Sequence, residues 1–284
     1  MSDAMVEVAP IPYAHYGYID RYCAFIDILG FRDLVRRLGG DNSQFETLRT
    51  LLAKIHSPVN PATKGWHIDF RAQSISDAVA ISTIANDTGL IHLFIAIEKL
   101  AVELLKEGYL IRGALVKGKL YHDDKMVFGD ALIHAYELES TIVRFPRVMI
   151  TRDVMQDVEG FCSGFLSDRR GIYQSHIEQA DDGPHYVHVL RTIANTIAKL
   201  QLENINLPPE KQHSLEEFAR IQAVIQKRLN ESTDKPRHFE KVQWFARYWN
   251  QHVPYGATKF TPITGPGMDI VTWRNPIPQP DGSL

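Results

Sequence analysis

The sequence predicts an α+β fold in which a mixed sheet is flanked by helices and followed by a C-terminal helical extension. Over roughly the first 150 residues, short apolar or alternating segments typical of strands are interleaved with helical periodicities. Beyond about residue 190 only the helical period remains. We expect an irregular arm over residues 1–19, a core domain over residues 20–192, and a helical extension over residues 193–284 that packs on the core.

The core is expected to begin with a buried strand. Tyr22–Leu29 is a short apolar run that Gly30 ends. Apolar side chains then recur at helical spacing over Phe31–Leu38, and a second helix is expected at Ser43–Ile55.

A β-hairpin and a long helix are expected next. Trp66–Gln73 and Asp77–Ile84 alternate apolar and polar residues on either side of a short turn, which is typical of antiparallel strands. Thr88–Glu107 is apolar on nearly every face, so we expect a helix buried against the sheet or against a partner subunit. Gly108 is placed to end this helix.

A second hairpin is expected from Tyr109–Lys119 and Met126–Gly129, which flank a polar tip. Asp130–Val143 has the periodicity of a helix, and Arg147–Thr151 is expected to return as a strand.

Three helices are expected in the extension. Ile193, Ile197 and Leu200 mark the first, and the capping box Ser214–Glu217 is expected to open the second. The third is Phe239–Val253, whose aromatic side chains are spaced as a packing stripe that belongs to the core.

Composition disfavours several classes of function. The 31 basic and 34 acidic residues are nearly balanced and interspersed, so we expect no nucleic-acid partner. The most apolar stretch, Leu90–Leu105, contains charged residues, so we expect no membrane span. Cys23 and Cys162 show no metal-binding spacing, so neither a zinc site nor a disulfide framework is expected. These features, and the lack of a signal-peptide pattern, predict a soluble cytoplasmic protein.

Asp27 and Asp77 are the candidate functional residues. An acidic side chain in an apolar strand is costly to bury unless its charge is met, and Asp27 lies in such a run. Asp77 directly follows the hairpin turn, so the two carboxylates converge if the first strand lies beside the hairpin. Two hard oxygen ligands suit Mg²⁺ or Mn²⁺ shared with a triphosphate. Each residue alone also fits a helix cap or a turn.

Backbone groups next to Asp27 complete this candidate site. The N–H groups of Leu29, Gly30 and Phe31 are expected to meet phosphate oxygens. The carbonyl oxygen of Ile28 is a further candidate metal ligand.

Three stretches, in this order, resemble motifs of the class III nucleotidyl cyclases. FIDILGF (Phe25–Phe31) resembles the first metal-binding motif, and SISDAVAIS (Ser74–Ser82) resembles the hairpin that carries the second metal-binding Asp. IRGALVKGKLYHDDKMVFGDALIHAYELE (Ile111–Glu139) is similar to the hairpin and helix that build the substrate pocket. The resemblance implies a cyclase-like mixed sheet, two Mn²⁺ or Mg²⁺ ions per site, a nucleoside triphosphate substrate, and a homodimer with sites at its interface.

The sequence also departs from the family pattern. Ser76 replaces the usual Gly of the second motif, Gln73 stands where purine-specific members carry a Lys, and the other base-reading position falls near Met126. Ile133 and Glu137 occupy the positions of the Asn and Arg that stabilise the transition state. These departures indicate that purine recognition is lost and that part of the catalytic apparatus is rearranged or lost.

The motifs FIDILGF, RGAL and AYELE, followed by a helical tail, look most like the bacterial pyrimidine cyclases of Pycsar anti-phage systems. That resemblance implies a uridylate cyclase, favoured over a cytidylate cyclase, whose cyclic product activates a separate effector. The alternative is a catalytically inactive cyclase-fold module that binds a nucleotide or regulates a partner. Ile133 and Glu137 favour the alternative, and the retention of Asp27 and Asp77 disfavours it.

A cyclase also needs a cation near the α-phosphoryl oxygens and a reader for the base. Arg112 is the first candidate cation, with a salt bridge to an acid such as Glu139 as its alternative role, and Arg147 is a weaker candidate. Gln73 and Tyr109 are the candidate base readers.

Overall fold

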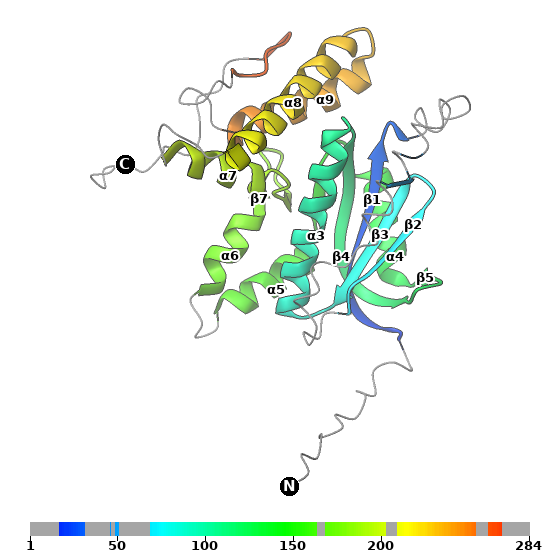
Figure 1. The fold of residues 1–284 in the computed structure, drawn as a ribbon. Helices are drawn as coiled ribbons and strands as arrows, with labels where there is room; N and C mark the ends of the chain where they lie inside the picture. Colours follow the sequence, from blue (N-terminus) through cyan, green and yellow to red (C-terminus); the bar gives the residue numbers. More distant parts are fainter. Residues whose placement is uncertain are drawn as a thin grey trace.

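The computed structural model describes residues 17–31, 46, 49–50, 69–163, 168–202, 209–253 and 261–268. The described part contains one mixed sheet with helices on both faces and further helices at the C-terminal end (Figure 1), which confirms the expected fold class. The strands are β1 (Ile19–Leu29), β2 (Arg71–Ile75), β3 (Ala78–Ile84), β4 (Leu110–His122), β5 (Val127–Phe128), β6 (Val148–Ile150), β7 (Ile177–Gln179) and β8 (His185–Val187). The helices are α3 (Asp87–Lys106), α4 (Asp130–Thr141), α5 (Arg152–Ser163), α6 (Asp168–His176), α7 (Arg191–Leu202), α8 (Pro209–Glu231) and α9 (Pro236–His252).

Two long antiparallel strands, β1 and β4, form the centre of the sheet. Their pairing runs from Ile19 opposite Leu120 to Leu29 opposite Leu110. The strand order is β2-β3-β1-β4-β6-β8-β7, with β5 paired to β4. The β4–β6 pair is parallel and the other pairs are antiparallel, so the sheet is mixed.

Side chains alternate between the two faces of β1 and reach two different helical layers. Tyr22 and Ile26 belong to the larger core cluster beneath α3, whereas Cys23 and Phe25 belong to the smaller cluster beneath α4. Figure 1 shows α3 and α4 on opposite faces of the sheet. The same alternation directs Asp27 to the α4 face.

Helix α3 is buried by its own chain. The side chain of Asn86 accepts a hydrogen bond from the N–H of Gly89 and caps the helix start. Gly108, at φ +80°, allows the chain to turn into β4. On the other side, α8 packs along α3 and pairs Glu217 with Lys106 at 2.9 Å. The sheet and α8 therefore account for the apolar character of α3 without a partner subunit.

The aromatic side chains of α9 pack into the core, as the sequence predicts. Phe245, Tyr248 and Trp249 are buried, with exposed fractions of 4%, 2% and 2%. The ring of Trp244 contacts Tyr186 of β8, at 5.7 Å between ring centroids. These contacts join α9 to the sheet.

Two local predictions are wrong. The first hairpin extends to Ile75 and turns at Ser76 and Asp77, so Asp77 belongs to the turn rather than to the start of β3. Helix α8 begins at Pro209, and Ser214–Glu217 lies inside it rather than at its start. Proline suits the first position of a helix because its missing N–H has no acceptor there.

Several elements were not predicted, namely α5, α6, β7 and β8, and the last two strands complete the far edge of the sheet. The helices expected at Phe31–Leu38 and Ser43–Ile55, and most of the N-terminal arm, lie outside the described residues. The proposed division of the chain after residue 192 stays a prediction. In the described part of the chain, each helix is too short or too polar to cross a bilayer.

Candidate functional site

Asp27 and Asp77 extend from neighbouring backbone segments at one end of the sheet. Asp27 lies one register position from the turn, opposite Ala78 in the β1–β3 pairing. The N–H of Ile28 donates a hydrogen bond of 3.0 Å to the carbonyl oxygen of Asp77, which fixes the turn against the end of β1. Both acidic side chains are half-buried. The two segments therefore meet, and the role of the pair as metal ligands stays a prediction.

The two carboxylates repel one another. Burial raises the pKa of the Asp27 carboxyl, Arg112 opposes this rise, and the negative charge of Asp77 adds to it. A divalent cation would relieve this repulsion, because carboxylate oxygens are the ligands that Mg²⁺ and Mn²⁺ prefer. The donor set at this end of the sheet therefore fits the expected ions.

Arg112 is shared by two acidic side chains on the α4 face. Its Nη2 lies 3.3 Å from Oδ2 of Asp27 and also forms an ion pair with Glu139. Its Nη1 donates a hydrogen bond of 3.3 Å to the carbonyl oxygen of Val143. The salt bridge to Glu139 that the sequence offered as an alternative is present. It occurs together with a contact to Asp27, so Arg112 is part of the candidate site.

Glu139 adds a third acidic group. Its side chain is only 6% exposed. Burial raises the pKa of the Glu139 carboxyl, Arg112 lowers it, and the nearby charge of Asp27 raises it further. The guanidinium of Arg112 is thus shared by the carboxylates of Asp27 and Glu139. The site therefore keeps an excess of negative charge that a cation can neutralise.

Lys241 is the functional candidate that the sequence did not reveal. It lies on α9, and burial together with the charge of Arg112 lowers the pKa of its ammonium group, while Asp27 and Glu139 raise it. These electrostatic couplings indicate that Lys241 lies within electrostatic range of the acidic cluster. Within the described residues it forms no ion pair. It is therefore a candidate cation for the site.

Gln73 and Tyr109 lie on opposite faces of the sheet. Gln73 pairs with Ala80 and so shares the α4 face with Asp27. Its Nε2 donates a hydrogen bond of 3.2 Å to the carbonyl oxygen of Lys125, and its buried Oε1 has no hydrogen-bond partner in the described structure. Tyr109 packs against the α3 core, with the guanidinium of Arg228 5.3 Å from its ring centroid. The structure therefore brings Gln73, and not Tyr109, to the Asp27 face.

The turn after β1 has room beside it. Gly30 adopts φ +89°, a conformation that side chains other than glycine rarely adopt, and a Cβ placed there would meet no atom within 4 Å. Leu29 ends β1 opposite Leu110, and Phe31 is buried with 7% exposure. The turn is therefore anchored on both sides, and among the described residues no atom lies within 4 Å of a Cβ at Gly30. Phosphate binding by its N–H groups stays a prediction.

The structure does not bring Arg147 to the acidic cluster. Both terminal nitrogens of Arg147 donate hydrogen bonds of 2.7 Å to the carboxylate of Asp182. Its guanidinium also lies 5.7 Å from the ring centroid of Trp244 and 5.6 Å from that of Phe145. The charge of Arg147 is paired in this separate cluster, and its catalytic role stays a prediction.

Three of the positions that depart from the family pattern are exposed. Met126 is 49% exposed at the tip of the second hairpin, and Ile133 is 57% exposed on the outer face of α4. Glu137 is exposed on the same helix. None of these side chains belongs to the Asp27 cluster within this chain.

No family model matches the sequence, and no curated protein matches it. Solved structures that resemble the chain include the monomeric guanylyl cyclase domain of a RhoGC fusion protein from the aquatic fungus Blastocladiella emersonii. That match has 18% identity and a TM-score of 0.36, over 60% of this chain and 95% of that one. The catalytic core of a rhodopsin–guanylyl cyclase with converted specificity, in complex with ATPαS, matches with 18% identity and a TM-score of 0.40 over the same shares. A class III adenylyl cyclase-like ATP-binding protein from Pseudomonas aeruginosa matches with 11% identity and a TM-score of 0.36, over 55% of this chain and 40% of that one.

Proposed function

We propose that this protein is a metal-dependent pyrimidine nucleotide cyclase. It would convert UTP, or alternatively CTP, to the 3′,5′-cyclic monophosphate and diphosphate. The observation that carries the proposal is the meeting of Asp27 and Asp77 at one end of the sheet, with Arg112 and Lys241 beside them. Two carboxylates and two cations are the groups that an in-line displacement on a triphosphate requires.

Asp27 and Asp77 would hold two Mn²⁺ or Mg²⁺ ions, with the carbonyl oxygen of Ile28 as a further ligand. When bound, such ions lower the pKa of the ribose 3′-hydroxyl and neutralise the β- and γ-phosphates. The half-buried carboxylates suit this role because burial and mutual repulsion make their negative charge costly without a cation.

In the reaction, the 3′-oxygen gives its proton to water and bonds to the α-phosphorus, while the bond from that phosphorus to the diphosphate oxygen breaks and diphosphate leaves. Negative charge develops on the α-phosphoryl oxygens. Among the described residues, Arg112 contacts Asp27 and Lys241 is electrostatically coupled to it, so these two cations are the candidates to stabilise that charge. We assign the main stabilising role to Lys241, because Arg112 is already paired with Glu139. These two residues would replace the Asn and Arg positions that carry Ile133 and Glu137.

Gln73 is the proposed reader of the base. Its Oε1 is a buried acceptor with no partner in the described structure, and the hydrogen bond from Nε2 to the Lys125 carbonyl fixes its direction. An unpartnered buried acceptor costs free energy until a ligand donor meets it. Both uracil, through N3–H, and cytosine, through its amino group, offer such a donor. Loss of the family's purine-reading Lys at this position agrees with the smaller base.

We also propose that the protein acts as a homodimer with its sites at the interface. The outer face of α4 exposes the large side chains of Ile133 and Tyr136 by 57% and 55%, and Ile142, directly after the helix, is 60% exposed. A face of this kind is typical of a surface that a partner covers. α4 also carries Glu139 and borders the acidic cluster, so a second copy on this face would close the site. From the resemblance to the Pycsar enzymes, we further propose that the cyclic product activates a separate effector in anti-phage defence.

The alternative is an inactive nucleotide-binding module. The ion pairs of Arg112 with Asp27 and Glu139 favour it, because they stabilise the acidic cluster without any ion. It predicts nucleotide binding without turnover, whereas a cyclase turns the nucleotide over only while Asp77 is present.

The test is incubation with each of the four labelled ribonucleoside triphosphates and Mn²⁺, followed by separation of cyclic products. Asp77→Asn is the matched variant, because it keeps the size of the turn side chain and removes its charge. We expect cyclic UMP or cyclic CMP from the natural chain and a loss of at least about a hundredfold in the variant. No cyclic product from any triphosphate would exclude the enzyme, and cyclic AMP as the main product would exclude the pyrimidine preference.

A further inference from the structure

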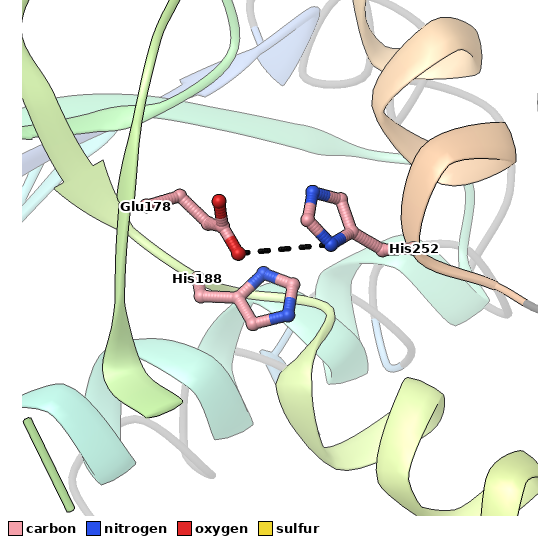
Figure 2. A group of neighbouring side chains, drawn as sticks. All are labelled: Glu178, His188 and His252. Atoms are coloured by element: carbon pink, nitrogen blue, oxygen red, sulfur yellow. Dashed lines mark ion pairs between the residues drawn. The ribbon is translucent and has the colours of Figure 1, made fainter. Parts of the chain in front are cut away.

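Three side chains outside the candidate active site converge at the junction of the sheet and α9. Glu178 lies on β7, His188 follows β8 directly, and His252 is the last residue of α9. Figure 2 shows the three side chains pointing toward one another. Their ligand atoms all lie within 4.8 Å of one another, and Oε1 of Glu178 is 3.7 Å from Nδ1 of His252. Among the residues that the structure describes, no other three His, Cys, Asp or Glu side chains are grouped in this way.

The two histidines of this cluster are shielded from water. His188 is 7% exposed, and the side chains of His252 and Glu178 are 9% and 31% exposed. The centroids of the two imidazole rings are 4.4 Å apart.

Tyr248 holds His188 in position. Its hydroxyl oxygen lies 2.6 Å from Nδ1 of His188 and accepts a hydrogen bond of 3.3 Å from the N–H of Leu190. Hydrogen bonds of this kind orient the histidines of metal sites and reduce the entropy lost when a metal binds. The imidazole of His188 is thus fixed before any ligand arrives.

We propose that Glu178, His188 and His252 bind a zinc ion that fastens the end of α9 to the sheet. Zinc binds imidazole nitrogen and carboxylate oxygen at about 2.0–2.2 Å in tetrahedral geometry, which places neighbouring ligand atoms roughly 3.3–3.5 Å apart. The Glu178–His252 separation of 3.7 Å is close to this spacing, and all three ligand atoms lie within 4.8 Å of one another. A water molecule would be the fourth ligand. Two nitrogen ligands favour zinc over Mg²⁺ or Mn²⁺, which prefer oxygen.

The sequence hides this site because its ligands are far apart along the chain. Only β7, β8 and α9 packed together bring Glu178, His188 and His252 to one place, and no short spacing rule detects such a set. The absence of a cysteine motif therefore does not exclude zinc here.

The alternative to zinc is an ion pair within the cluster. Protonation of His252 would give an ion pair with Glu178 that needs no metal. That ion pair would involve two of the three side chains, whereas zinc would use all three. The two possibilities differ in a measurable way, because only the metal site makes the stability of the protein depend on zinc.

The location of the site gives zinc a structural role. Lys241 lies about three turns, or roughly 16 Å, before His252 on α9 and therefore on nearly the same side of the helix. Lys241, the candidate cation for the acidic cluster, is also on α9. A zinc ion bound by His252 would fix the C-terminal end of this helix to the sheet. The zinc proposal does not depend on cyclase activity, because it concerns the junction of α9 with the sheet.

The test is to titrate metal-free full-length protein with Zn²⁺ in excess Mg²⁺, which occupies the oxygen site at Asp27 and Asp77. We expect one tightly bound zinc per chain, a Tm raised by several degrees, and tetrahedral visible absorption when Co²⁺ replaces Zn²⁺. Absence of stoichiometric binding, or binding that leaves Tm unchanged, would overturn the proposal.

Two variants assign the bound metal to its ligands. His252→Ala and Glu178→Gln should each weaken zinc binding at least about tenfold and reduce the rise in Tm. His185→Ala is the matched control, because His185 lies on β8 three positions from His188 and outside the cluster. If His252→Ala fails to fold, the zinc affinity of Glu178→Gln tests the site by itself, because this variant replaces a partly exposed side chain with one of nearly equal size. Equal zinc affinity in Glu178→Gln, His185→Ala and the natural chain would place the metal elsewhere and refute the site.

Discussion

Replacing Lys241 with methionine separates its proposed catalytic role from a structural one. Lys241 lies close enough to Asp27 and Glu139 for their charges to raise its pKa, yet it forms no ion pair within the described residues. Removal of one positive group that meets charge in a transition state costs about 2.7–4 kcal/mol, or roughly 10²–10³ in kcat. We therefore expect Lys241→Met to lower kcat by two to three orders of magnitude, by the same estimate.

The same substitution should hardly affect stability. Burial and the charge of Arg112 already disfavour the charged form of Lys241, and methionine keeps an unbranched side chain of similar length. The expected change in the free energy of unfolding is under about 1 kcal/mol. Catalysis and stability thus respond very differently, which a purely structural role for Lys241 does not predict.

The assay measures cyclic product at saturating pyrimidine triphosphate and Mn²⁺, alongside urea denaturation of the same samples. Lys241→Arg should recover much of the rate because it retains the positive charge. Since the pKa of Lys241 is lowered, the natural enzyme should lose rate as the pH rises through that pKa, and the Arg variant should lose it only at higher pH. Lys227→Met, on an exposed side chain of α8, is the control. A kcat for Lys241→Met within about threefold of the natural value would refute the reasoning.

Three further predictions concern the fold and the site. Leu93→Ala, at a fully buried position of α3, should reduce the free energy of unfolding by about 2–5 kcal/mol in urea denaturation, and a loss below 1 kcal/mol would contradict the packing of α3. Arg112→Met should reduce it by about 3–5 kcal/mol because Asp27 and Glu139 lose their shared partner. Adding Glu139→Gln to that variant should restore part of the loss, and strict additivity in this double-mutant cycle would rule out the coupling. Because Arg112 lowers the pKa of Asp27, its removal should also move the midpoint of Mn²⁺ binding to higher pH, as calorimetry at several pH values can measure. Gly108→Val should destabilise the protein by more than about 1 kcal/mol, since Gly108 has φ +80° and an added Cβ would lie 2.8 Å from Val224; unchanged thermal stability would contradict this.

Some errors of the sequence interpretation could have been avoided with local information. Tyr109 and Arg112 are an odd number of positions apart at one strand end, so alternation alone predicts that they face opposite sides of the sheet. The structure has Tyr109 in the α3 core and Arg112 on the α4 face. Pro209 was likewise a local signal for the start of α8. The helix begins there and not at the capping box Ser214–Glu217.

Other features could not be predicted from local patterns. Arg147 has the same chemistry as Arg112, and only the fold pairs it with Asp182. The apolar character of α3 fits a partner subunit as well as it fits α8, and the packing of α8 decides between them. Glu178, His188 and His252 show no spacing along the chain that links them.

The sequence alone determined the strand that carries Asp27, the hairpin that presents Asp77, and the helical character of the C-terminal part. These features arise from alternation, helical periodicity and turn residues, which act over a few neighbouring positions. Only the tertiary structure decided which charges surround Asp27. Lys241 comes within electrostatic range of Asp27 because α9 buries its aromatic face against β8 and its neighbours, and that packing depends on side chains distant in the sequence.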